Sequence, residues 1–455
     1  MPASWAVVGG GFLGMSLALR LAQQNKRVTL FEGAAKLGGL AAGWQLGDIT
    51  WDRFYHVILS TDSHLRALLR EMDMDGELQW NCTRTGFYID SQLHSMSSTL
   101  EFLRFPPLNL YEKVRLAATI VRASRSYDEK SLDQIPVDEW LEQWSGKSVT
   151  EKIWRPLLRA KLGEEYRRAS AAFITNTIAR MYGARSSGAK TELFGYMPGG
   201  YERIIRRFQQ LLKRHGVDIR LGCPIQSVTR QPSGKLRIEL SDGQAECFSK
   251  VVLTTPTCVA AEMCADLTRV EKENLTGISY QGIICASLLL KEPLSPFYIT
   301  NITDKLVPFT AVIEMSALVD RKEFGGKSLV YLPKYLSPKS PYFLLTDHEI
   351  REDFLTSLAL MYPRFRRDDL LCIQLSRVKH LLPIPTINYS AKIPKMLTSI
   401  PGLHLVNSTQ IVDGTLNINE TVRLAESAAK VLGRQKSASN PTRLQLEHEF
   451  ATAHS

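Results

Sequence analysis

The sequence lacks the long apolar run that a membrane-spanning helix needs. Such a helix takes about 20 consecutive apolar residues, and no uninterrupted stretch of this chain reaches that length. A strand is predicted to start at Trp5, which leaves no room ahead of it for a secretory signal peptide. We therefore expect a cytoplasmic protein.

The cysteine patterns of disulfide frameworks and metal sites are also lacking. The 455 residues include seven cysteines, scattered between Cys82 and Cys372 without a C-x-x-C pair. We expect buried thiols in a reducing compartment and no metal site, because no His/Cys spacing fits one. The net charge of +10 is spread along the chain without a nucleic-acid module, so no nucleic-acid partner is expected. A basic surface would suit anionic lipid or an anionic substrate.

The clearest pattern present runs from Trp5 to Gly39, WAVVGGGFLGMSLALRLAQQNKRVTLFEGAAKLGG. It predicts a buried strand, a G-x-G-x-x-G turn, a helix and a second strand that Glu32 closes. Gly9 allows the tight turn, Gly11 lets the backbone approach a pyrophosphate, and Gly14 lets the helix pack on the strand. The phosphate charge would rest on the helix N-terminus.

Glu32 favours a nucleotide with a free ribose 2′-hydroxyl, because a carboxylate accepts hydrogen bonds from hydroxyls and repels a 2′-phosphate. The alternative for this residue alone is a solvated strand end. The order of strand, turn, helix, strand and acid predicts dinucleotide binding.

Beyond this unit, Gly38-Gly39 and the segment from Trp51 to His56 resemble the flavin amine-oxidoreductase superfamily, which includes protoporphyrinogen oxidase, phytoene desaturase, monoamine oxidase and UDP-galactopyranose mutase. The resemblance implies that the second glycine pair passes close to the pyrophosphate and flavin of FAD. Leu40 is a departure, because many members carry arginine there.

Two later segments extend the resemblance to nearly the whole chain. In one, Gly199-Gly200 opens an amphipathic helix, and the backbone beside Ile225 is implied to pair with adenine. In the other, a last helix, expected from Glu420 to Leu432, is implied to point its N-terminus at the flavin. Asn419 is expected to be its N-cap. The residues assigned to the cofactor are Gly9, Gly11, Phe12, Leu13, Gly14, Glu32, Gly33, Gly38, Gly39, Leu40, Gly199, Gly200, Ile225, Thr255, Asn419, Thr421 and Val422.

The resulting fold class is α/β, with a discontinuous Rossmann-like FAD-binding domain and an interleaved α+β substrate-binding domain. The FAD-binding domain is expected in segments 1–62, 191–281 and 386–433. The substrate domain is expected in a mainly helical part, 63–190, and a sheet part, 282–385. Residues 434–455 read as a disordered tail.

Two helical regions of the expected substrate domain leave alternatives open. Residues 102–125 join a Phe/Leu/Pro loop to a basic helix, which either lies on a membrane surface or is a core helix with a solvated basic face. Arg155, Arg159 and Lys161 either meet an anionic substrate or lie on a solvated helix face.

A bound flavin accepts a hydride itself, so no catalytic acid or base is required. Tyr55 and His56 are nevertheless candidate catalytic residues; His56 could hydrogen-bond substrate, act as a general base, or be structural. Covalent attachment of the monoamine-oxidase kind uses a cysteine in the C-terminal segment, and none follows Cys372, so FAD should be noncovalent. No residue matches the lysine that amine oxidases place near the flavin, which disfavours a simple amine substrate.

Three functions are compatible with these patterns. The first is an FAD-dependent oxidase or desaturase acting on a large, partly apolar or anionic small-molecule substrate, with peripheral association on the inner face of a membrane. The second is a redox-neutral, mutase-like enzyme. The third is a prenyl-binding escort protein, which is disfavoured because Gly9, Gly11, Gly14 and Glu32 are intact. The oligomeric state is left open.

Overall fold

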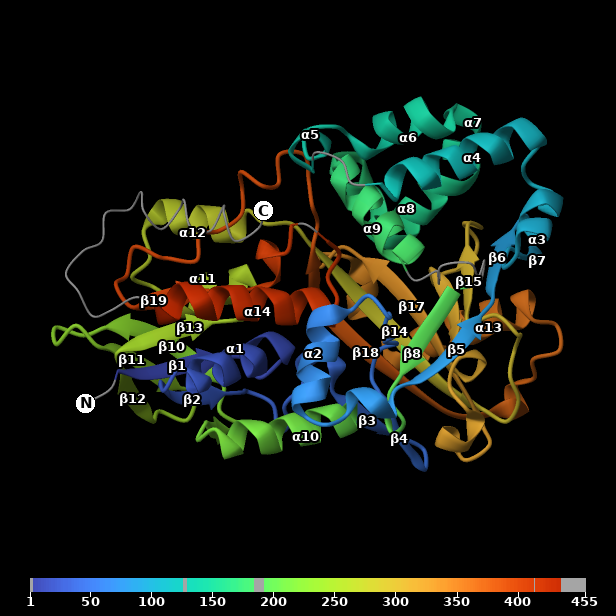
Figure 1. Ribbon diagram of the computed structural model, residues 1–455. Coiled ribbons are helices and arrows are strands. Elements are labelled where there is room, and N and C mark those ends of the chain that lie inside the picture. The colour runs from blue at the N-terminus through green and yellow to red at the C-terminus, as the bar shows by residue number, and fades with distance from the viewer. Residues whose placement is uncertain (1–2, 126–128, 184–191, 413, 435–455) are drawn as a thin grey trace.

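A computed structural model describes residues 3–125, 129–183, 192–412 and 414–434. One part is a parallel sheet in the order β19-β13-β1-β2-β9. Its strands are β1 (Ser4–Val8), β2 (Arg27–Phe31), β9 (Asp218–Arg220), β13 (Lys250–Leu253) and β19 (Leu403–Leu405). Three distant stretches of the chain therefore build one sheet (Figure 1), which confirms the predicted α/β class.

Both faces of this sheet are covered, because β1 sends Trp5 and Val7 into one apolar cluster and Ala6 and Val8 into another. The first cluster contains side chains of four helices, of which α1 and α14 lie side by side (Figure 1). These helices are α1 (Phe12–Gln23), α2 (Ser63–Glu71), α10 (Gly200–Arg214) and α14 (Ile418–Gly433). The second cluster joins the sheet to a three-stranded meander and a pair of short helices. They are β10 (Ile225–Arg230), β11 (Leu236–Leu240), β12 (Ala245–Phe248), α11 (Thr257–Met263) and α12 (Arg269–Thr276).

A second, seven-stranded sheet has the order β18-β14-β17-β16-β15-β6-β7. It is antiparallel except where β15 runs parallel to β6. Strand β14, between β18 and β17, is buried at every residue. The strands are β6 (Thr85–Ile89), β7 (Gln92–Ser95), β14 (Tyr280–Leu290), β15 (Ile299–Ile302), β16 (Ala311–Glu314), β17 (Ser328–Leu336) and β18 (Leu370–Pro383).

Each face of this second sheet packs into its own apolar cluster. Helix α13 (Asp347–Met361) covers one face. The other face packs against two-stranded pairs, β3 (Gly43–Leu46) with β4 (Ile49–Asp52) and β5 (Gln79–Thr83) with β8 (Glu192–Tyr196). The hairpin β3–β4 lies directly after the second glycine pair, so the chain passes from the nucleotide part straight under the second sheet.

A helical lobe lies at the upper right of Figure 1. Its helices share an apolar core of their own. They are α3 (Thr99–Arg104), α4 (Leu110–Ala123), α5 (Glu129–Leu132), α6 (Val137–Ser145), α7 (Lys147–Val149), α8 (Arg155–Leu162) and α9 (Ala171–Gly183). A π-helix over Thr150–Trp154 leads into α8, which packs on β15 and β17 of the second sheet. None of the described helices combines the length and the apolar character required to cross a bilayer.

The strands and helices agree closely with the sequence patterns, whereas the expected domain boundaries stay predictions. One expectation about side chains is partly wrong. None of the seven cysteines, all of which lie in the described ranges, forms a disulfide, but only Cys264 and Cys285 are buried, and Cys82 and Cys247 are exposed.

Gly14 tests the packing of α1 on β1. A β-carbon at this position would lie 1.8 Å from the carbonyl oxygen of Gly9, so the helix must move away from the strand. We expect Gly14→Ala to lower the free energy of unfolding by about 2 kcal/mol or more, measured by urea denaturation. The control is Gly76→Ala, whose β-carbon would meet nothing within 4 Å; equal urea midpoints for the two variants would contradict this account.

Candidate functional site

The first glycine turn joins the carboxyl end of β1 to the N-terminus of α1. Gly9 has a φ of +113° and donates its N–H to the Phe31 carbonyl at 2.8 Å. The Thr254 hydroxyl donates to the Val8 carbonyl at 2.9 Å and fixes the turn from the β13 side. A β-carbon on Gly11 would meet only Gly39 Cα, at 4.0 Å. The turn is therefore closed by its neighbours except in front of Gly11, where a ligand can approach the backbone.

The second glycine pair lies against this turn. Gly38 donates its N–H to the Gly10 carbonyl at 2.8 Å and forms an isolated bridge with Gly11. Gly38 and Gly39 both have positive φ, and a β-carbon on Gly39 would lie 3.1 Å from Gly11 Cα. Leu40 then packs at the edge of the apolar cluster under the second sheet. The two glycine segments thus meet in space, as their proposed shared ligand requires.

The Glu32 carboxylate is held rather than solvated. One oxygen accepts the N–H of Gly10 at 2.6 Å and the other accepts the N–H of Ala34 at 2.8 Å. The backbone carbonyl of Glu32 accepts the N–H of Cys223 at 2.9 Å, which brings the segment before Ile225 beside the acid. A β-carbon on Gly33 would lie 3.5 Å from Pro224. Glu32, Gly33 and Ile225 are therefore neighbours at the end of β2.

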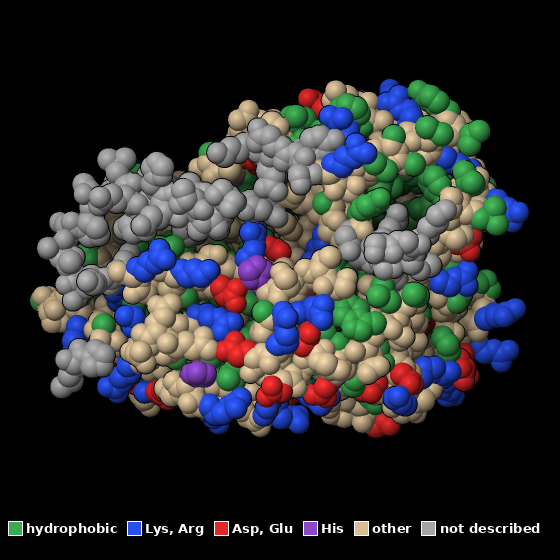
Figure 2. All heavy atoms as spheres, in the orientation of Figure 1, with side chains coloured by type: hydrophobic (Ala, Val, Ile, Leu, Met, Phe, Trp, Pro, Cys, Tyr) green, Lys and Arg blue, Asp and Glu red, His purple; other side chains and the backbone are tan. Residues whose placement is uncertain are grey.

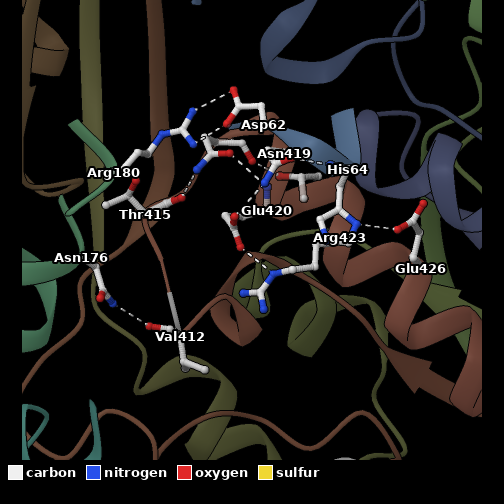
Figure 3. Close-up of polar contacts among 12 residues, drawn as sticks. Asp62, His64, Asn176, Arg180, Val412, Thr415, Asn419, Glu420, Arg423 and Glu426 are labelled. Atoms are coloured by element: carbon white, nitrogen blue, oxygen red, sulfur yellow. Dashed lines mark hydrogen bonds and ion pairs between the residues drawn. The ribbon is translucent and has the colours of Figure 1, made fainter. Parts of the chain in front are cut away.

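The start of α14 differs from expectation. Asn417, not Asn419, is the N-cap, and its side-chain oxygen accepts the Glu420 N–H at 3.0 Å. The Asn419 oxygen instead accepts the N–H groups of His64 at 2.9 Å and Leu65 at 3.2 Å, at the start of α2 (Figure 3). The prediction of Asn419 as N-cap was wrong because its side chain reaches another helix.

The side chains of the other α14 residues assigned to the cofactor are hydrogen-bonded within the helix or buried. The Thr421 hydroxyl donates to the Asn417 carbonyl at 2.7 Å, and Val422 is fully buried. Phe12 and Leu13 at the start of α1 are likewise buried. At Phe12 and Leu13 only backbone N–H groups could serve a ligand, as is common at helix N-termini. The Thr421 N–H already donates to the Asn417 carbonyl at 3.1 Å, so the roles of Thr421 and Val422 at the cofactor stay predictions.

Gly199 and Gly200, also with positive φ, begin α10 beside the hairpin β3–β4. Gly199 donates its N–H to Glu323, and a β-carbon on Gly200 would lie 2.9 Å from the Asp52 carboxyl. The structure brings this pair to Asp52 rather than to the first glycine turn, and their role at the cofactor stays a prediction.

A cavity of about 320 Å³ opens between the helical lobe and the start of α14. Its size lies within the range of small-molecule sites, which is roughly 300–1,000 Å³. Arg180 of α9 donates two hydrogen bonds to Asp62, at 2.6 and 3.1 Å, and Asn176 donates to the Val412 carbonyl (Figure 3). These side chains tie the lobe to the nucleotide part around the cavity. No sequence motif marked them.

Two buried polar atoms lack a partner among the described residues at the carboxyl edge of the parallel sheet. They are Thr255 Oγ1, after β13, and Asn407 Nδ2, after β19. The glycine turn follows β1 and Glu32 follows β2, so all four groups come after the carboxyl ends of neighbouring strands. Open α/β sheets bind ligands at this edge, and a buried polar atom without a partner costs about 1–3 kcal/mol. The donor set and the glycine geometry fit a dinucleotide.

Asp52 and His56 form an uncharged pair next to Tyr55. Asp52 is buried and accepts the Tyr201 N–H at 2.8 Å; burial raises the pKa of its carboxyl to about 8. His56 Nδ1 lies 4.0 Å from Asp52 Oδ2, and burial lowers the pKa of the imidazole to about 4. Both groups are thus neutral near pH 7 and make no ion pair. A neutral imidazole with so low a pKa is a weak base, which favours hydrogen bonding over proton abstraction by His56.

Tyr55 reaches across to the second sheet, where its hydroxyl lies 2.7 Å from that of Tyr335 on β17. Of the three cations in α8, Arg155 pairs with Asp138 and Glu142, and Arg159 pairs with Glu164. Lys161 instead points inward and donates to Tyr335 at 2.7 Å. The solvated-face alternative therefore fails for Lys161.

The profile of a family described as flavin containing amine oxidoreductase matches residues 14–413. The chain belongs to this family. It is 31% identical over 265 residues to carotenoid phi-ring synthase of Streptomyces griseus, an alignment that covers 52% of this chain and 49% of that protein. It is 23% identical over 394 residues to 15-cis-phytoene desaturase of Solanum lycopersicum, covering 80% of this chain and 65% of the relative. The chain thus spans about half to two thirds of the length of these relatives.

Solved structures share the fold across nearly the whole chain. A protein from Exiguobacterium sp. 255-15 described as a protoporphyrinogen oxidase has a TM-score of 0.76 at 19% identity, covering 95% of this chain and 99% of the other. Reduced UDP-galactopyranose mutase has a TM-score of 0.71 at 15% identity, covering 96% of each chain. The flavin-family assignment and the predicted FAD-type fold are thereby confirmed.

The buried Asp52 carboxyl predicts a pH dependence of stability. Because its pKa is about 8 in the folded protein and near 3.9 in an unfolded chain, the folded state binds more protons and stability falls as pH rises. His56, with a folded pKa of about 4, opposes this trend below about pH 6.5. From about pH 6.5 to about pH 8 the free energy of unfolding should fall by up to about 2 kcal/mol.

Asp52→Asn should abolish this decline, because the amide does not titrate. Its oxygen can still accept the Tyr201 N–H, so the contact is kept. The measurement is the free energy of unfolding in urea at about pH 6.5 and at about pH 8. The control is Asp73→Asn, at an exposed residue with positive φ that asparagine also tolerates. An unchanged pH slope in Asp52→Asn would show that the carboxyl does not titrate as stated.

Proposed function

We propose that the protein binds FAD noncovalently and oxidises a large, partly apolar or anionic small-molecule substrate. The observation that carries the proposal is the meeting of the two glycine segments, Glu32 and the unpartnered Thr255 and Asn407 at one edge of the parallel sheet. When bound, the isoalloxazine ring supplies the hydride acceptor.

The protein's own residues bind and orient the cofactor. The first N–H groups of α1 would hold the pyrophosphate charge, with Gly11 allowing close approach. The Glu32 oxygens have lone pairs left for ribose hydroxyls after accepting from Gly10 and Ala34. The N-terminus of α14 would favour negative charge near the flavin. No cysteine follows Cys372, which supports noncovalent binding.

The substrate class is supported by the residues near Tyr55. Hydride removal from an apolar substrate needs no strong base, and His56 is a weak one. The surrounding cluster of the second sheet is mostly aliphatic and aromatic, which suits an apolar substrate. The relatives named as phytoene desaturases act on such a molecule by name. A redox-neutral, mutase-like reaction is the second candidate, because reduced UDP-galactopyranose mutase shares the fold.

Gly11→Ala separates cofactor binding from folding. Its β-carbon meets only Gly39 Cα, at 4.0 Å, so we expect the urea midpoint to stay within about 0.5 kcal/mol of wild type. The same methyl group blocks the approach of a pyrophosphate, so FAD retention should fall at least about tenfold. The measurement is the absorbance near 450 nm of purified protein and of flavin released by denaturation, with Gly76→Ala as control. Wild-type protein that is colourless and takes up no added FAD would overturn the proposal.

Anaerobic mixing with 15-cis-phytoene or protoporphyrinogen tests the reaction class. Bleaching of the flavin absorbance by either compound supports hydride transfer to FAD. Turnover of a sugar nucleotide only after prereduction, without net electron transfer, would instead favour the redox-neutral candidate.

We also propose that the lobe docks on an anionic membrane surface through α3 and α4, on the inner face of a membrane. Helix α4 exposes large apolar side chains near its start: Leu110 is 68% exposed, Tyr111 67% and Val114 59%. Leu100 and Leu103 of α3 are also exposed. Figure 2 shows hydrophobic side chains gathered with Lys and Arg over the lobe.

The inward side of α4 carries charge beside the buried apolar residues Leu116 and Ala123. Glu112 is buried and accepts hydrogen bonds from Ser148 and Lys152, and Lys113 is buried and donates to the Leu103 carbonyl at 2.8 Å. At the start of this helix charged side chains thus lie inward and large apolar side chains lie outward, unlike in an ordinary surface helix. This arrangement supports an interfacial helix over a core helix with a solvated basic face.

A triple change of Leu110, Tyr111 and Val114 to Ser tests the docking surface. Each side chain would lose about 1.5–3 kcal/mol of fully buried apolar contact, so sedimentation with phosphatidylglycerol-containing vesicles should fall at least tenfold, about 1.4 kcal/mol or more. The matched control changes Leu306, Leu344 and Leu360, which are also highly exposed but lie elsewhere, to Ser. Equal losses in the two triple variants, or no wild-type binding, would contradict the proposal.

A further inference from the structure

Three polar side chains from distant segments form a continuous chain between the helical lobe and the cofactor part. Lys161 of α8 donates from Nζ to the Tyr335 hydroxyl of β17 at 2.7 Å. The Tyr335 hydroxyl lies 2.7 Å from the Tyr55 hydroxyl, which belongs to the segment after β4. The Lys161 ammonium also lies 3.9 Å from the centroid of the Tyr335 ring.

Lys161 is a cation without a counter-ion. Among the residues that the structure describes, no carboxylate lies within ion-pair distance of its Nζ, whereas Arg155 and Arg159 of the same helix are paired. Burial lowers the pKa of the Lys161 ammonium. A buried charge is costly unless an opposite charge accompanies it. The π-helix over Thr150–Trp154 precedes α8 directly, and such turns occur often at functional sites.

The donor inventory fixes one of the two hydrogen bonds. An ammonium only donates, so the Tyr335 oxygen accepts from Lys161. Either hydroxyl can donate in the Tyr335–Tyr55 bond, and an acceptor placed beyond Tyr55 favours the arrangement in which Tyr335 donates. Burial raises the pKa of Tyr335 to about 12 and also raises the pKa of Tyr55, so both hydroxyls stay protonated. When Tyr335 donates to Tyr55, the proton of Tyr55 points away from the chain. A charge at the start of such a chain polarises it and strengthens the terminal donor.

The chain is partly accessible inside the molecule. Tyr55, His56, Tyr335 and Lys161 each keep part of their surface accessible, although protein surrounds them. Tyr55 and Tyr335 pack against the same aliphatic and aromatic cluster as Leu40, the residue after the second glycine pair. The donor therefore faces apolar surroundings that continue from the cofactor segment.

We infer that Tyr55, Tyr335 and Lys161 form a binding site for a carboxylate carried on an apolar body. Tyr55 donates to the carboxylate directly, while Tyr335 and Lys161 are positioning residues that supply the charge behind it. The inference rests on the proposed function for the assignment of this molecule as the substrate of the flavin.

Calorimetric titration of the purified protein with benzoate and with its neutral analogue benzamide tests the site. Calorimetry needs no flavin signal, so loss of FAD would count against the proposed function without deciding this inference. We expect Tyr55→Phe to weaken benzoate at least about tenfold, the effect of one hydrogen bond to a charged group. We expect Lys161→Met to lower the preference for benzoate over benzamide by at least about tenfold, while Lys161→Arg retains most of it.

The matched control is Arg159→Met on the same helix, whose partner Glu164 is exposed, and it should leave both affinities unchanged. A merely structural role for Lys161 would weaken both probes equally, which would overturn the inference. So would a wild-type protein that does not bind benzoate, or a Tyr55→Phe variant that binds it as well as wild type. Circular dichroism verifies that each variant is folded.

Discussion

The hydrogen bond from Gly38 N–H to the Gly10 carbonyl joins the two functional halves of this molecule. On one side of it lies the turn that carries α1, and on the other the chain enters the hairpin β3–β4 under the second sheet. The contact requires glycine at both positions of the second pair, because a β-carbon on Gly38 would lie 2.5 Å from Ile205 and one on Gly39 3.1 Å from Gly11. The position of Tyr55, seventeen residues after Gly38 in the chain, depends on this crossing.

The electrostatics of the region follow from its burial. Asp52 and His56 are driven towards their neutral forms, one by a raised pKa and the other by a lowered pKa. Arg180 is neutralised by Asp62 at the cavity near α14. Lys161 is a cation in this region for which the described residues offer no acid. Its ammonium can influence which ligand binds nearby, because a low local dielectric strengthens its field.

The sequence predicted the features that depend on local pattern and not those that depend on which surfaces meet. The glycine turn and Glu32 are encoded within one β-α-β unit, so their spacing could be read directly. Asn419 has the right chemistry for an N-cap, but its oxygen reaches α2, whose residues lie more than 350 positions away. Lys161 shares a helix with Arg155 and Arg159, which form ion pairs. Only the packing of α8 on β17 shows that the Lys161 side chain points inward. No local signal could have separated them.

Helix α4 shows why an apolar period alone does not place a helix. Its residues alternate apolar and charged positions as a core helix would, and hydrophobic burial would normally turn the apolar side inward. Here Glu112 is bound by Lys152 and Ser148, and Lys113 is held by a carbonyl, so the charged side satisfies its hydrogen bonds inside the lobe. That network leaves Leu110 and its neighbours outward. The helix is stable in water only at the cost of this exposed apolar surface, and contact with lipid would remove that cost.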